Sequence, residues 1–175
     1  MASSAEVEAM RQAIDHAVRV GTRRGPNPRV GCVILTSSGE VAGLGGHAGS
    51  GYPHAEVVAL EQARDAARGG TAIVTLEPCR HTGRTGPCVD ALIGVDVEPG
   101  VLVTEATSLN ERWTGAVIRE RPWVVWKVAA TLDGRIAAAD GTATWITGEE
   151  ARLDAHRERA DCDAILVGTT TALQD

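Results

Sequence analysis

Residues 53–79 read PHAEVVALEQARDAARGGTAIVTLEPC, and this stretch decides the fold. A proline opens a helical segment and a pair of glycines closes it. The β-branched run at 71–76 then predicts a buried strand that ends in a turn. Upstream, the apolar run 30–36 and the glycine-rich segment 41–46 predict two more strands, behind an amphipathic helix from residue 4 to about residue 21. Alternating helices and short apolar strands indicate an α/β layered fold.

A second group of elements follows residue 94. We expect a short strand and turn at 95–103 and a helix at 105–120 that ends before a proline. The segment 122–134 (PWVVWKVAATLDG) predicts a new strand, and the charged segment 148–161 predicts an amphipathic helix. The short apolar run AILVG at 164–168 predicts a further buried strand.

Composition excludes several classes of function. The chain has 175 residues and a net charge of −6, so it lacks the basic face of a nonspecific nucleic-acid or anionic-membrane binder. Since neither a membrane-length apolar run nor a signal-like N-terminus is present, we expect a soluble, cytoplasmic chain. Four cysteines are few for a disulfide scaffold, which favours metal binding or burial for them.

The chemically informative residues are His54 and Glu56 at a helix start, followed by Cys79 and Cys88, each behind a proline. A zinc ion that keeps one coordination position open takes three protein ligands, here one imidazole and two thiolates. Water in the open position becomes a nucleophile near neutral pH. Glu56, two residues from His54, is placed to carry protons instead of binding the metal. This layout is typical of zinc-dependent base deaminases.

Two other interpretations of these residues stay open at this point. The cysteines could form a disulfide, or be buried beside a surface histidine. The zinc could instead be purely structural, which requires a fourth protein ligand. His81 and Cys32 are the candidates for that ligand.

Four segments carry a closer resemblance: PNPRVGCVIL at 26–35, GGH at 45–47, PHAEVVAL at 53–60 and LEPCRHTGRTGPC at 76–88. They resemble the riboflavin-biosynthesis deaminase/reductase family, RibD. The eight residues between Cys79 and Cys88 match the loop of that family, whereas the broader deaminase signature has two.

The resemblance implies a cytidine-deaminase-like three-layer α/β/α zinc domain followed by a partial dihydrofolate-reductase-like α/β segment. The implied reaction is hydrolytic deamination of 2,5-diamino-6-ribosylamino-4(3H)-pyrimidinone 5′-phosphate, with Zn²⁺ as cofactor. Ligands would be His54, Cys79 and Cys88, with Glu56 as the catalytic proton carrier. Four residues match substrate-contacting positions: Asn27, His47, His81 and Arg84. Arg84 also suits a phosphate on chemical grounds, because its guanidinium fork matches phosphate oxygens.

The segments WKVAATLDGRIA (126–137), TWITGEEAR (144–152) and DAILVGTTT (163–171) resemble the start of the family's reductase domain, which uses NADPH. Matching positions place Arg159 near the substrate. The positions implied to lie near NADP are Ala129, Trp145, Thr171 and Asp175.

Compared with that family, roughly 30 residues, about one strand–helix unit, are missing after Ile93. The family's reductase domain also continues beyond the last residue, so we predict that this chain reduces nothing by itself. We divide the chain into a deaminase domain (1–105), a connecting helix or linker (106–122) and the N-terminal part of a reductase domain (123–175).

Two further hypotheses remain. The chain could be a non-catalytic, zinc-stabilised module that binds a partner or its own copies through exposed sheet edges. It could also deaminate another pyrimidine nucleoside or nucleotide. We expect a phosphorylated pyrimidine as the small-molecule partner and no nucleic acid or membrane, and we leave homo-oligomerisation open.

Overall fold

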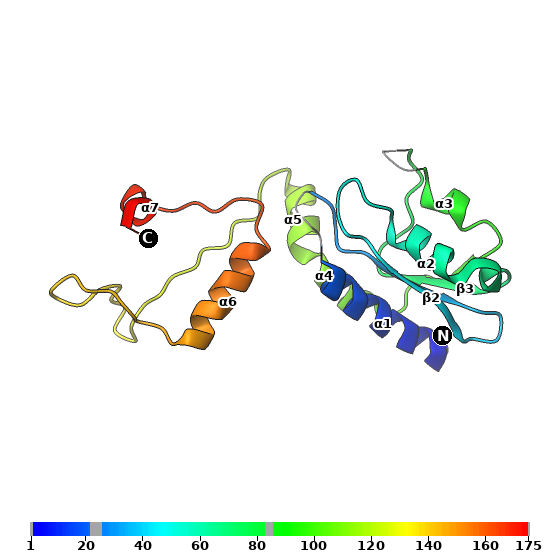
Figure 1. Ribbon diagram of the computed structural model, residues 1–175, viewed down its shortest axis with the longest axis horizontal. Coiled ribbons are helices and arrows are strands. Elements are labelled where there is room, and N and C mark those ends of the chain that lie inside the picture. The colour runs from blue at the N-terminus through cyan, green and yellow to red at the C-terminus, as the bar shows by residue number, and fades with distance from the viewer. Residues whose placement is uncertain (1, 22–25, 83–85, 175) are drawn as a thin grey trace. The chain divides into compact units, whose positions relative to one another are not determined.

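The computed structural model describes residues 2–21, 26–82 and 86–174. The chain forms two compact units, Met1–Trp123 and Val124–Asp175, and each is treated by itself. The helices and strands of the first unit are visible in Figure 1. In chain order they are α1 (Ser4–Val20), β1 (Gly31–Leu35), β2 (Val41–Gly46), α2 (Ala55–Ala63) with a 3₁₀ turn (Arg64–Ala67), β3 (Thr71–Val74), α3 (Cys88–Ala91), β4 (Asp96–Val97), α4 (Val103–Leu109) and α5 (Glu111–Arg119).

The sheet of the first unit has the strand order β2-β1-β3-β4. Strand β1 is central and antiparallel to both neighbours, so that Cys32 pairs with Gly45 on one side and with Val74 on the other. Strand β4 is parallel to β3 and contains two residues. The predicted strands 30–36, 41–46 and 71–76 are thereby confirmed, with each end shifted by at most two residues.

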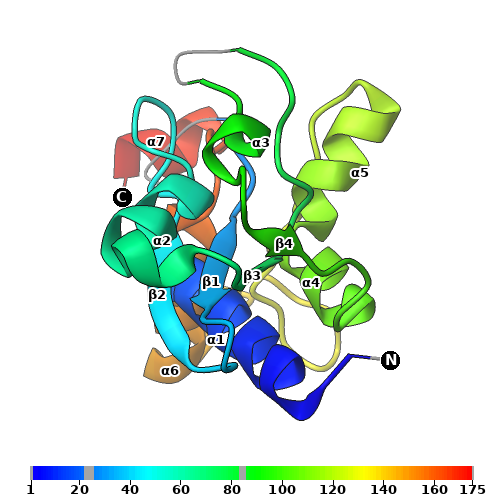
Figure 2. The ribbon, with the colours of Figure 1, turned by 90° about the vertical axis from the view of Figure 1, so that its right-hand side faces the viewer.

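Helices cover both faces of this sheet, which gives the three-layer arrangement seen in Figure 2. Because side chains alternate along a strand, β1 sends Val33 and Leu35 to one face and Cys32 and Ile34 to the other. The first pair packs in a core with α1 and residues of α4, and the second packs against α2 and residue Leu92.

Helix α2 lies unusually close to strand β2. A Cβ atom added at Gly45 would lie 2.1 Å from the carbonyl oxygen of Ala55, and one at Gly43 would lie 2.1 Å from that of Ala59. The facing helix residues are themselves alanines with no exposed surface. Only glycine on the strand permits this approach, and it fixes the start of α2 against the sheet.

The segment 106–122, for which the sequence analysis expected a connecting helix or linker, lies within the first compact unit. It forms the end of α4 and all of α5, and Ala106 and Asn110 are buried. Burial of both residues shows that this segment packs into the first unit.

The second unit contains helices α6 (Glu149–Ala160) and α7 (Thr169–Gln174). The predicted helix at 148–161 is thereby confirmed. The predicted strands within 122–134 and at 164–168 are wrong, because neither segment is a strand in the described chain. Residues 164–168 are also exposed instead of buried. Both segments have β-forming side chains, but a strand also needs a hydrogen-bonded neighbour, and the described residues supply none.

Among the described residues, we find no helix with the length and apolar character needed to span a membrane.

Replacing Gly45 by Ala tests the close helix–sheet approach. The added methyl would meet the backbone of α2, so we expect a loss of about 1–3 kcal/mol in the free energy of unfolding, measured by urea denaturation. Val41→Ala, at a half-exposed position of the same strand, is the control and should cost no more than about 1 kcal/mol. Equal stability of Gly45→Ala and the wild type would contradict the packing described here.

Candidate metal centre and active site

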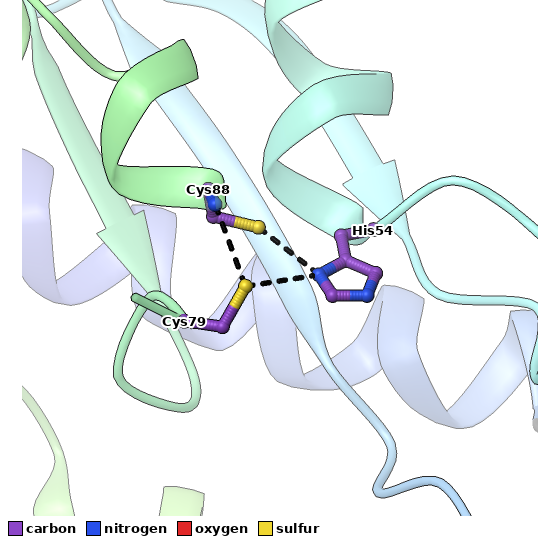
Figure 3. Close-up of side chains that lie close together, drawn as sticks. All are labelled: His54, Cys79 and Cys88. Atoms are coloured by element: carbon purple, nitrogen blue, oxygen red, sulfur yellow. Dashed lines mark hydrogen bonds between the residues drawn. The ribbon is translucent and has the colours of Figure 1, made fainter. Parts of the chain in front are cut away.

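Three potential metal ligands converge from three separate elements. His54 is the N-cap residue of α2, Cys79 lies in the loop after β3, and Cys88 is the first residue of α3. Their side chains point toward one another in Figure 3. His54 Nδ1 lies 3.0 Å from Cys88 Sγ and 3.6 Å from Cys79 Sγ. The N-cap side chain makes no capping hydrogen bond, which leaves the imidazole available for another partner.

This donor set fits a zinc ion. The three ligand atoms all lie within 4.8 Å of one another. Tetrahedral zinc, with Zn–S bonds of about 2.3 Å and Zn–N bonds of about 2.0–2.1 Å, holds its ligand atoms roughly 3.5–3.8 Å apart. The distance to Cys79 matches this range and the distance to Cys88 is somewhat shorter. Small side-chain adjustments would therefore suffice to admit the metal.

The surroundings also bear on the two other interpretations of the cysteines. In the part of the chain that the structure describes, the group of ligands contains His54, Cys79 and Cys88, and neither Cys32 nor His81 belongs to it. Cys79 and Cys88 are free thiols. Cys32 is fully buried in the core beside α2. Three ligands without a fourth protein donor favour a site with an open position over a closed structural site.

The surroundings of Cys88 favour its protonated thiol over the thiolate. Burial raises the pKa of Cys88, and the nearby carboxylate of Glu56 and the thiol of Cys79 raise this pKa further. The Sγ atom of Cys79 accepts a hydrogen bond of 3.4 Å from the backbone N–H of Cys88. Since metals bind the thiolate, zinc uptake must displace the Cys88 proton.

Glu56 is the buried carboxylate of the site. It lies in the first turn of α2, two residues after His54, and its side chain is 3% exposed. Its carboxylate lies close enough to Cys88 to raise the pKa of that thiol. The carboxylate is therefore beside the metal ligands without being one of them, as a proton carrier requires.

Asn27 and His47, expected to contact substrate, are joined by a hydrogen bond. Asn27 Nδ2 and His47 Nε2 are 2.8 Å apart, and His47 Nδ1 lies 3.1 Å from the carbonyl oxygen of Pro53. The His47 ring also packs edge-on against His54, with 5.2 Å between ring centroids. The structure thus brings these two residues to the metal group.

His81 is exposed on the loop between β3 and α3, and no contact places it at the ligand group. Arg84 and Asp175 lie outside the described residues.

The NADP positions are not gathered in the described part of the second unit. Trp145 lines a cavity of about 780 Å³ with Asp133 and Arg135, and its ring lies 4.3 Å from the guanidinium of Arg152. The cavity lining does not include Ala129 or Thr171. Arg159 is exposed on α6 and does not line this cavity either. The described residues of the second unit therefore do not fit a nucleotide site.

Sequence reasoning missed Asn110 and Trp113. Asn110 makes two hydrogen bonds to the backbone of Arg29, and Trp113 Nε1 donates one to the carbonyl oxygen of Pro26. An asparagine before a helical pattern indicates a helix cap, so the sequence offered no signal for partners more than 80 residues away.

Comparison with known proteins agrees with the fold and indicates a zinc-binding region in the first unit. The family model for the cytidine and deoxycytidylate deaminase zinc-binding region matches residues 3–104, and the model for the RibD C-terminal domain matches residues 122–175. The chain belongs to the zinc-binding cytidine and deoxycytidylate deaminase family. The second family model describes a domain of RibD proteins, and the relatives reported below are also RibD proteins.

Among curated relatives, the riboflavin biosynthesis protein RibD of Mycobacterium tuberculosis is 42% identical, over 96% of this chain and 58% of its own length. RibD of Escherichia coli is 40% identical, over 95% and 53%. A solved structure from Thermotoga maritima, described as a diaminohydroxyphosphoribosylaminopyrimidine deaminase/5-amino-6-(5-phosphoribosylamino)uracil reductase, superposes with a TM-score of 0.88 at 37% identity. That match covers 98% of this chain and 57% of the solved one.

The chain thus spans little more than half the length of these relatives. The match to the Mycobacterium tuberculosis protein extends over 197 residues, which exceeds the 175 residues of the chain. This relative therefore has residues without a counterpart here. That the missing unit follows Ile93 stays a prediction.

Replacing Cys88 by Ser tests the ligand set. A serine hydroxyl is a poor zinc ligand, so we expect the zinc content of the purified chain to fall from near one per chain to well below half. Cys162→Ser, at an exposed cysteine of the second unit, is the control and should keep the wild-type zinc content. Unchanged zinc in Cys88→Ser, measured by atomic absorption, would exclude Cys88 as a ligand.

Proposed function

We propose that this chain is a zinc-dependent aminohydrolase that deaminates a phosphorylated diaminopyrimidine on the route to riboflavin. The observation that carries the proposal is the buried Glu56 carboxylate beside the open three-ligand group His54, Cys79 and Cys88. Membership of the deaminase family and the likeness to RibD relatives support the same reaction and substrate.

In this proposal each residue has a defined task. Bound zinc supplies activation of the attacking water at neutral pH. The Glu56 carboxylate accepts the water proton and delivers it to the ring nitrogen next to the carbon that carries the amine. The second proton of that water, now on the hydroxyl group bound to the ring carbon, passes through Glu56 to the amine. The bond from carbon to the amine then breaks, ammonia leaves and a carbonyl is formed, so one water is consumed. Burial of Glu56 keeps this transfer away from bulk solvent.

The substrate is held, in the same proposal, by residues around the metal. Asn27 and His47 would contact the pyrimidine, because they are hydrogen-bonded to each other and His47 packs on the ligand His54. His81, from the loop that joins the two cysteine ligands, is a further proposed substrate contact. We assign the phosphate to Arg84 on the same loop, since a guanidinium forms paired hydrogen bonds with phosphate oxygens.

Glu56→Gln tests the assignment of the proton carrier. The amide keeps the size of the side chain but cannot take up the proton, so ammonia release should fall by at least about a hundredfold. Zinc content should remain that of the wild type, because Glu56 is not a ligand. Glu61→Gln changes an exposed carboxylate of the same helix and should leave turnover unchanged. Wild-type turnover in Glu56→Gln would refute the assignment.

A comparison of phosphorylated and dephosphorylated substrate tests the role of Arg84. Loss of one charge-assisted contact should lower kcat/KM for the phosphorylated substrate by about 10- to 100-fold in Arg84→Ala. The same variant should leave kcat/KM for the dephosphorylated substrate unchanged. Arg80→Ala, at an exposed arginine of the same loop, is the matched control. If Arg84→Ala lowers kcat/KM equally for both substrates, the assignment of the phosphate to Arg84 is wrong.

The exposed edge of the sheet supports a second candidate function, a zinc-stabilised module without catalysis. Strand β4 has two residues, of which Val97 is 42% exposed, and Ile93 shortly before the strand is 82% exposed. Such an edge can pair with another chain. A zinc-loaded chain that dimerises with rising concentration and releases no ammonia from either substrate would favour this candidate.

A further inference from the structure

The loop that carries Asn27 is held by the junction of α4 and α5. Asn110, between these helices, accepts a hydrogen bond of 2.7 Å from the backbone N–H of Arg29 and donates one of 2.7 Å to the carbonyl oxygen of Arg29. One helical turn further, Trp113 Nε1 donates a hydrogen bond of 2.6 Å to the carbonyl oxygen of Pro26. The anchors thus flank Asn27 on both sides.

The loop around Asn27 has few other polar groups that could hold it, so the hydrogen bonds from Asn110 and Trp113 fix its position. Pro26 and Pro28 fix two backbone torsions and offer no N–H donors, so few polar groups remain to hold the loop. Asn110 satisfies both backbone groups of Arg29 with one amide, as a neighbouring strand would do. Its side chain is 5% exposed, so water does not compete freely for these bonds.

The side chain of Asn27 is held by a hydrogen bond with His47. A carbonyl oxygen only accepts, so the bond between His47 Nδ1 and Pro53 requires the proton on Nδ1. The NH₂ group of Asn27 faces Nε2 and can only donate, so Nε2 is the acceptor of this bond. Among the described residues no hydrogen bond involves the amide oxygen of Asn27, and this oxygen is accessible to a ligand because no buried side-chain oxygen or nitrogen is left without a partner.

We propose that Asn110 is a positioning residue for the deaminase site: by clamping the backbone of Arg29, it holds Asn27 so that the amide oxygen serves as an acceptor for a nitrogen donor of the substrate. The assignment of Asn27 as a substrate contact rests on the proposed function. Asn110 itself lies outside the residues 3–104 that match the deaminase family model. The α4–α5 segment thus completes a site whose zinc ligands and proton carrier all precede it.

The test compares Asn110→Ala with Ser108→Ala in the full, zinc-loaded chain. Ser108 is the matched control, because its hydroxyl donates only to the carbonyl oxygen of Thr104 on the exposed side of α4. The first readout is nuclear magnetic resonance of the His47 ring nitrogens together with amide hydrogen exchange at Arg29. In Asn110→Ala we expect shifted His47 signals and exchange at Arg29 accelerated at least about tenfold, whereas Ser108→Ala should match the wild type.

The second readout is kinetic. We expect Asn110→Ala to raise KM for the pyrimidine by about 10- to 100-fold, with a smaller change in kcat, because the loss is one of positioning. In an Asn27→Ala background, Asn110→Ala should then have almost no further effect on kcat/KM, because it acts through Asn27. If Asn110 had a merely structural role, the two substitutions would lower kcat/KM independently and their effects would multiply in the double variant. That result would overturn the proposal.

If Asn110→Ala does not fold, Asn110→Asp takes its place. The carboxylate keeps the acceptor for the Arg29 N–H and loses the donor to the Arg29 carbonyl oxygen, so the same changes in His47 signals and Arg29 exchange are expected. Unchanged signals in a folded variant would overturn the positioning role. Shifted signals in a chain that never releases ammonia would support the clamp and refute the proposed function, so the two failures are distinguishable.

Discussion

The close packing of helix α2 on strand β2 is the constraint on which the candidate site depends. Gly43 and Gly45 let the helix backbone approach the strand, with the carbonyl oxygens of Ala55 and Ala59 where a Cβ atom would stand. This contact fixes the first turn of α2, and therefore the imidazole of His54 and the carboxylate of Glu56. A helix displaced by the width of one methyl group would carry both groups away from the cysteines of the facing loop.

The second half of the site comes from the chain between β3 and α3. Cys79 and Cys88 are joined by the hydrogen bond from the Cys88 backbone N–H to Cys79 Sγ, so they approach the histidine as a pair. Burial and the neighbouring Glu56 raise the pKa of Cys88, which makes a thiolate there dependent on a cation. Metal binding at Cys88 therefore displaces a proton, and the affinity for zinc should fall as pH falls because protons compete for the thiol.

The sequence predicted the parts of this structure that follow from local pattern or ligand chemistry. His54, Glu56, Cys79 and Cys88 could be identified because a zinc site with an open position demands those residue types. The clamp of Asn110 on Arg29 could not, because nothing local links an asparagine at a helix start to a loop 81 residues earlier. The prediction of strands in 122–134 and at 164–168 was wrong for a related reason. Side-chain propensity indicates an extended segment, but pairing depends on a neighbour that propensity does not reveal.

The central claim is that the metal centre has three protein ligands and one exchangeable position. X-ray absorption spectroscopy of the zinc-loaded chain tests it most directly, because it counts sulfur and imidazole ligands separately. We expect two sulfur atoms at about 2.3 Å, one imidazole and one further light atom at about 2.0–2.1 Å. A third sulfur from Cys32, or a second imidazole from His81, would close the site and exclude an exchangeable position.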